Sequence, residues 1–116
     1  MATMTRDPAT DAASEATLRR DLAACFRLCA LNGWADHIAT HMSARLPDGT
    51  FLLNPFGLLF EETTASNLMR VDLNGNVVSP PGHPMNPAAF TIHSAVLAGR
   101  PDVACAIHLH TLDGAA

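Results

Sequence analysis

Val103-Ala104-Cys105-Ala106-Ile107-His108-Leu109-His110 is a short apolar run that ends in two histidines. Arg100-Pro101-Asp102 precedes it as a typical turn, so the run predicts a buried strand. Alternate side chains of a strand point to one face, and we therefore expect His108 and His110 to project together. Two such imidazoles can supply two of the three protein ligands of a catalytic zinc ion. The alternative is a pair of histidines that bond only to the backbone, because so short a motif often arises by chance.

Length and composition set the class of protein. The 116 residues suffice for one modest domain, and a hydrophobic content of 48% with 16% charged residues argues against a disordered chain. The formal net charge of -4 gives no basis for binding nucleic acid or a membrane surface. No apolar run approaches the length of a membrane span, and the N-terminus lacks the apolar core of a secretory signal.

The cysteines indicate the cellular compartment of the protein rather than a metal-binding or redox site. Cys25, Cys29 and Cys105 match no zinc-knuckle or CxxC spacing. We interpret all three as small buried residues in a reducing environment and expect a cytoplasmic protein. The polar, small residues 1–13 predict a disordered leader, which leaves residues 14–116 as the folded part.

Two helices are predicted from the spacing of apolar residues. The first runs from a cap at Ser14 or Asp11 to about residue 32 and is followed by Gly33, which suits the left-handed conformation that ends a helix. The second spans about 87–98 and begins with the Asn-Pro pair typical of a helix start. The side chains expected to face inward from this second helix are Ala89, Ile92 and Val96.

Short strands are predicted between the helices. Turn residues Pro47-Asp48-Gly49 and Asn74-Gly75 each indicate a hairpin. Residues 58–61 are expected to be extended, and 63–67 to form one helical turn. The predicted strands cover residues 38–46, 50–54, 68–73 and 77–79. This order of helices and strands predicts a mixed α/β or α+β unit.

Other polar residues are further candidates for a site. His93 lies on the second predicted helix, where three roles are open to it: third metal ligand, partner of a ligand, or general base. A histidine at a helix–sheet boundary with no such role is the alternative. His41 and Ser43 share a face of one predicted strand and would form a polar wall of a pocket.

Several stretches of the sequence occur together in a recognisable order. They are Asp36–Arg45, Phe51–Leu58, Asn86–Ala95, Arg100–Val103 and Ala106–Thr111. In this order and spacing they resemble the class II aldolase/adducin family, and more closely its adducin-like branch, over roughly residues 15–116. The resemblance implies a three-layer α/β/α fold with a central, largely antiparallel sheet. The chain would supply about the first half to two-thirds of it.

The resemblance also implies a zinc site of three histidines. Two of them match His108 and His110, and the third lies beyond residue 116 in the family. The family's aldolases use the zinc as a Lewis acid, together with a glutamate that exchanges protons. The position of that glutamate is Ala89 in this chain, which leaves His93 as the candidate replacement.

The substrate pocket implied by the resemblance also departs from the aldolases. The positions that hold a substrate phosphate in the family match Thr40-His41, Asn54 with Gly57, and Pro87-Ala88. Only Gly57 is unchanged, although Ser43 is retained nearby. The candidate substrate-binding residues are therefore His41, Ser43, Asn54 and Gly57, and a sugar phosphate is not the expected substrate.

Three interpretations of function follow. The first is a zinc-dependent lyase or epimerase acting on a small sugar-like or hydroxy-carbonyl compound, in a family whose members often form homo-oligomers. The second is a non-catalytic adducin-like module that associates with other proteins, as adducin does at the actin–spectrin cytoskeleton. The third is a truncated gene product, whose last strand leaves an unpaired apolar edge and promotes aggregation.

Overall fold

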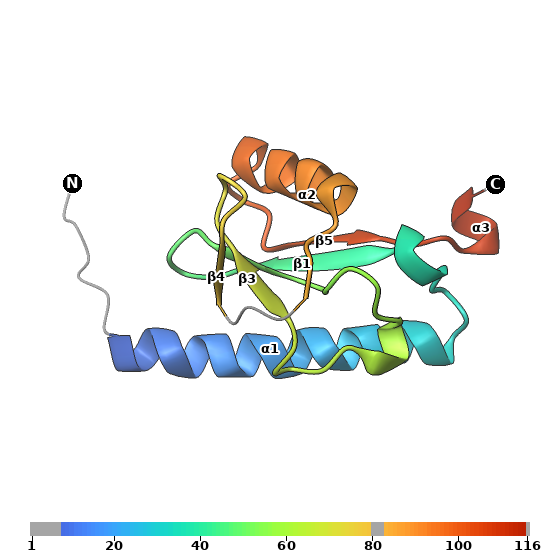
Figure 1. Cartoon of the computed structure of the whole chain (residues 1–116), viewed down its shortest axis with the longest axis horizontal. Helices are drawn as coiled ribbons and strands as arrows, with labels where there is room; N and C mark the ends of the chain where they lie inside the picture. Colours follow the sequence, from blue (N-terminus) through green and yellow to red (C-terminus); the bar gives the residue numbers. More distant parts are fainter. Residues whose placement is uncertain (1–7, 80–82, 116) are drawn as a thin grey trace.

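Side chains alternate along the central strand, and this gives the sheet two faces that need cover. From β1 (His41–Arg45), Met42 and Ala44 enter one apolar core, while Ser43 points to the opposite face. The computed structural model describes residues 8–79 and 83–115. It places α1 (Pro8–Leu31) against the first face and α2 (Pro87–Gly99) against the second (Figure 1). The predicted three-layer α/β/α arrangement is thereby confirmed.

The sheet has five strands in the order β4-β3-β2-β1-β5, and every neighbouring pair is antiparallel. Besides β1, the strands are β2 (Phe51–Leu53), β3 (Met69–Val71), β4 (Val77–Ser79) and β5 (Cys105–His108). The predicted turn at Asn74-Gly75 joins β3 to β4, with Gly75 at a φ of 91°. Pairing of His41 with His108 fixes β5 beside β1, at the edge of the sheet.

Short helical turns replace parts of the predicted pattern. A 3-10 turn, η1 (His37–Ala39), delays the first strand, which was expected to start at residue 38. A second one, η2 (Phe60–Glu62), stands where an extended segment was predicted. Residues 65–67 form a turn rather than the predicted helical turn, and α3 (Leu112–Ala115) follows β5. These segments are too short for periodicity to distinguish helical from extended backbone.

Helix α1 covers its face of the sheet with a stripe of apolar side chains. Leu22, Phe26 and Cys29 are buried, and the Phe26 ring meets Phe60 edge-to-face with centroids 4.6 Å apart. Complete burial of one such phenylalanine contributes about 2–3 kcal/mol. The helix begins at Pro8, before both predicted caps, Asp11 and Ser14, because proline suits a first helical turn. Residues 1–7 of the predicted leader lie outside the described residues.

Helix α2 buries Ala89 as predicted, but the rest of its buried face differs from the prediction. Its buried side chains are Ala89, His93 and Leu97, whereas Ile92 is 46% exposed and Val96 is 37% exposed. The prediction was wrong for Ile92 and Val96 because it placed only apolar residues inward, whereas His93 occupies the middle of the buried stripe. Asn86 caps the helix as expected, accepting hydrogen bonds from two backbone amides. Within residues 8–79 and 83–115, no helix combines the length and hydropathy of a membrane span.

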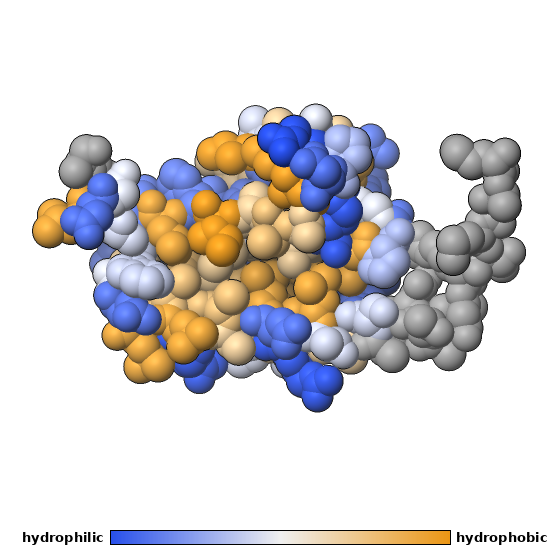
Figure 2. All heavy atoms as spheres, turned by 180° about the vertical axis from the view of Figure 1, so that it is seen from behind, coloured by the Kyte–Doolittle hydropathy of each residue, from blue (hydrophilic) through white to orange (hydrophobic). Residues whose placement is uncertain are grey.

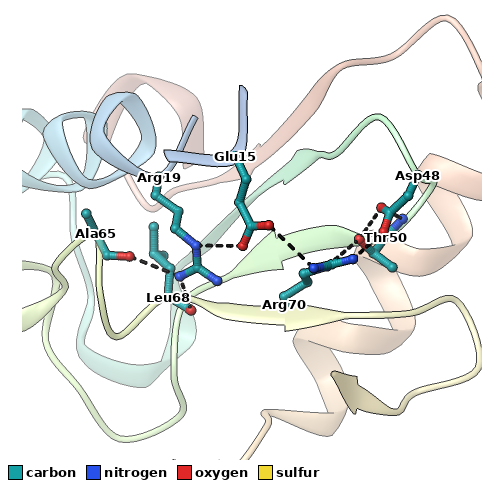
Figure 3. A network of polar contacts seen from close by, with 7 residues as sticks. All are labelled: Glu15, Arg19, Asp48, Thr50, Ala65, Leu68 and Arg70. Carbon is teal, nitrogen blue, oxygen red and sulfur yellow. Dashed lines mark hydrogen bonds and ion pairs between the residues drawn. The ribbon is translucent and has the colours of Figure 1, made fainter. Parts of the chain in front are cut away.

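Two groups of polar contacts connect the layers. Glu15 on α1 bonds Arg19 at 2.9 Å and Arg70 of β3 at 3.4 Å, and Arg70 also pairs with Asp48 in the β1–β2 turn (Figure 3). On the other face, Arg45 donates to three carbonyls at the end of α2 and in the loop that follows. The second group fixes the segment that leads into β5.

Strand β5 is an exposed edge, not the buried strand that was predicted. Ile107 is 53% exposed and Cys105 is also exposed, because only β1 pairs with this strand. Seen from behind, apolar side chains gather between α1 and α2 (Figure 2). A groove of about 170 Å³ in this region is lined by Leu18, Asp21, Leu22, Cys25, Ala44, Cys105 and Ile107. The expectation of three buried cysteines holds for Cys29 alone.

We predict that this edge makes the 116-residue chain self-associate. An unpaired strand with exposed apolar side chains offers its backbone to another chain, and a lysine on the strand opposes such pairing. Ile107→Lys should therefore lower the apparent mass in sedimentation velocity and sharpen thermal unfolding. Leu73→Lys, at a 43% exposed turn position, is the matched control and should change neither. A wild-type chain that is monomeric and unfolds in a sharp, reversible transition would contradict the prediction.

Candidate functional site

Histidines from three elements meet on the side of the sheet covered by α2. His41 begins β1, His93 lies on α2, and His108 ends β5, with His110 just beyond it. The strand register places His41 directly opposite His108, and their rings stack with centroids 4.7 Å apart and planes 15° from parallel. The site thus has a buried part, around His93, and an exposed part, around His110.

The buried part is a hydrogen-bonded chain of three side chains. Ser43 Oγ lies 2.5 Å from His93 Nδ1, and His93 Nε2 lies 2.7 Å from His41 Nδ1. All three residues are at most 4% exposed. A neutral His93 carries its proton on one ring nitrogen, so it donates through that nitrogen and accepts through the other. Its tautomer therefore sets the direction of both hydrogen bonds together.

Both buried imidazoles are neutral at neutral pH. Burial, with smaller effects from the charges of His41 and His108, lowers the pKa of His93 to about 4. Burial likewise lowers the pKa of His41 to about 4, with smaller effects from His108 and His110. A buried imidazole loses contact with water, and this loss of hydration disfavours its protonated, charged form.

The exposed part joins two imidazoles to a carboxylate. The Nε2 atoms of His108 and His110 lie 3.1 Å apart, and His110 Nδ1 lies 2.8 Å from Asp36 Oδ2. Two nitrogen ligands of one tetrahedral zinc ion are separated by about 3.3 Å, so the histidine pair fits one edge of such a site. Among the residues that the structure describes, no group of three or more potential ligands is arranged to hold a metal.

The other predicted site residues lie apart from this pair. Asn54 is 8% exposed, and its side-chain oxygen accepts the backbone N–H of Met42, which ties β2 to β1. Gly57 occupies an exposed turn with a φ of 93°. Ala89, at the position of the family's glutamate, is buried in the core beneath α2. The substrate-binding roles of His41, Ser43, Asn54 and Gly57 stay predictions.

Sequence reasoning missed Asp36. The carboxylate sits just before η1 and is separated from His110 by 74 positions in the chain. Nothing in the local pattern around it signals a site, since an isolated aspartate before a turn is common. Only the pairing of β1 with β5 brings it to the histidines.

Comparisons with known proteins identify the family of the chain. A family model described as the Class II Aldolase and Adducin N-terminal domain matches residues 20–116. The chain belongs to the class II aldolase/adducin family. It is 54% identical over 106 residues to a provisionally named aldolase class 2 protein of Pseudomonas aeruginosa, covering 90% of this chain and 40% of the relative.

Relatives occur on both branches of the family. Alpha-adducin of Mus musculus is 46% identical over 106 residues, which cover 88% of this chain and 14% of that protein. The solved structure of an L-fuculose 1-phosphate aldolase from Glaciozyma antarctica superposes with a TM-score of 0.84 at 35% identity. That match covers 96% of this chain and 47% of the solved chain. The chain therefore spans less than half of each relative.

We predict that the stability of the metal-free chain falls as the pH drops from 6.5 to 4. In this window the unfolded state binds protons at His41 and His93 that the folded state does not, since the folded pKa of each is about 4. Each histidine contributes at most about 1.4 kcal/mol per pH unit, and their contribution is constant above the window. Urea unfolding in a chelator at a series of pH values measures the slope.

Replacing one of the two groups tests the assignment. His93→Gln removes one depressed pKa and should reduce the slope between pH 4 and 6.5. His83→Gln, at an exposed loop position, should leave the slope unchanged. An identical slope in His93→Gln and wild type would show that the buried imidazole does not control the acid sensitivity.

Proposed function

We propose that this chain carries two ligands of the divalent-metal site of a zinc-dependent lyase or epimerase, acting on small sugar-like or hydroxy-carbonyl compounds. The observation that supports this most is the His108–His110 pair, whose Nε2 atoms lie 3.1 Å apart. Bound there, zinc would act as a Lewis acid that polarises a substrate oxygen. Because the chain spans 40% of its Pseudomonas aeruginosa relative, the third ligand is proposed to come from polypeptide outside these 116 residues.

The chain's own residues favour metal binding over catalysis by the chain alone. Ala89 has no proton to exchange, and both ring nitrogens of His93 are already bonded, to Ser43 and to His41. For His93 to act as a base, one of these buried hydrogen bonds would have to break, at a cost of about 1–3 kcal/mol. We therefore place His93 among the residues that support the site, and His108 and His110 among those that bind the metal.

Zinc titration of the 116-residue chain tests this proposal. We expect the chain to bind Zn²⁺ at a stoichiometry near one, and His108→Ala or His110→Ala to weaken binding at least tenfold, because each removes one of two ligands. Competition with a chromophoric chelator measures the affinity. His83→Ala, which removes an exposed loop histidine, is the control and should bind like wild type. Absence of binding, or equal binding by all variants, would refute the proposed site.

A second candidate function is association of the adducin type. It is favoured by Ala89 at the acid/base position and by the 46% identity to alpha-adducin. In this case the chain should co-sediment with actin filaments, and His108→Ala should not change the bound fraction, because association would not use the metal ligands. Recovery of the chain in the supernatant alone would remove this candidate.

A further inference from the structure

Asp36 controls the orientation of one proposed ligand. An ionised carboxylate has no proton to donate, so Asp36 Oδ2 can act only as an acceptor. The proton of the 2.8 Å contact therefore belongs to His110 Nδ1. A neutral imidazole carries one proton. His110 Nε2 is therefore left with a free lone pair, directed toward His108. This is the nitrogen that a metal ion at the histidine pair requires.

The hydrogen bond between the two rings places His108 in the other tautomer. The Nε2 atoms lie 3.1 Å apart, and one of them must donate if they form a hydrogen bond. Because His110 Nε2 is the acceptor, His108 Nε2–H is the donor. The two proposed ligands are therefore not equivalent before metal binding: His110 is ready to coordinate, whereas His108 must first move its proton from Nε2.

Asp36 is itself held by the turn that precedes β1. Its backbone N–H donates to Thr40 Oγ1 at 3.1 Å, and its carbonyl accepts the N–H of Ala39 at 2.9 Å. Thr40 is 1% exposed and anchors the turn to the sheet. His37 closes the turn with a φ of 46°, in the left-handed region that non-glycine residues rarely adopt. The backbone that carries the carboxylate is thus held in a turn by two hydrogen bonds.

We propose that Asp36 is a positioning residue of the metal site, which accepts the Nδ1 proton of His110 and so fixes Nε2 of that imidazole as the metal-binding atom. The inference rests on the proposed function. Carboxylates that accept a proton from a metal-bound imidazole raise its basicity and hold its ring, and their loss typically lowers metal affinity 10–100-fold. Asp36 begins one of the stretches that resemble the family, but the resemblance implies no role for it.

Long-range ¹⁵N–¹H spectra of the metal-free chain test the inference without any metal. We expect His110 to carry its proton on Nδ1 in the wild type and to shift toward the Nε2–H form in Asp36→Ala. Asp36→Asn keeps an acceptor oxygen and should retain most of the Nδ1–H form. Because Asp36 is half exposed, with a side chain 53% accessible, these variants should fold like the wild type.

Zinc affinity then gives a second readout. Asp36→Ala should bind Zn²⁺ 10–100-fold more weakly, and Asp36→Asn should lie between it and the wild type. Asp113→Asn, an exposed aspartate three positions after His110, removes the same charge without touching the imidazole and should bind like the wild type. An Nε2–H form of His110 in the wild type, or an unchanged tautomer and affinity in Asp36→Ala, would overturn the inference. A wild type that binds no zinc would refute the proposed function, while the spectra would still decide the role of Asp36.

Discussion

The hydrogen-bonded chain from Ser43 through His93 to His41 is the interaction on which the site depends. It occupies the face of β1 opposite to the apolar core under α1, so one strand both closes a core and orients imidazoles. A shift of one residue in the register of β1 would exchange these faces and bury the polar groups among the side chains of α1. Because no buried side-chain nitrogen or oxygen of the described residues lacks a hydrogen-bond partner, polar groups are accommodated there at little cost.

Local features of the fold could be predicted where the responsible residues are neighbours in sequence. The hairpin around Gly75, the cap at Asn86 and the common direction of His108 and His110 are of this kind. The buried face of α2 and the exposure of β5 could not be predicted in the same way. Each depends on what the element packs against, and a polar residue in a buried stripe reverses the inference from apolar periodicity.

The candidate site likewise has one part that local sequence predicts and another that depends on the fold. Its two exposed histidines belong to one motif, whereas the residues that orient them come from β1, from α2 and from the turn before β1. The structure joins these parts through the stacked rings of His41 and His108, which connect the buried and exposed halves. What the family resemblance implies for zinc chemistry therefore concerns His108 and His110, while Asp36, His41 and His93 reach them from other segments of the fold.

The pairing of β1 with β5 also has a kinetic meaning. It closes the longest loop of the sheet, which contains three strands and α2, and loop closure of this kind is slow because chain entropy is lost before contacts form. Asp36 and His110, 74 positions apart, meet only after that step. The contact between Asp36 and the histidine pair therefore depends on closure of this loop, so the assembled site reports that the two ends of the domain have come together.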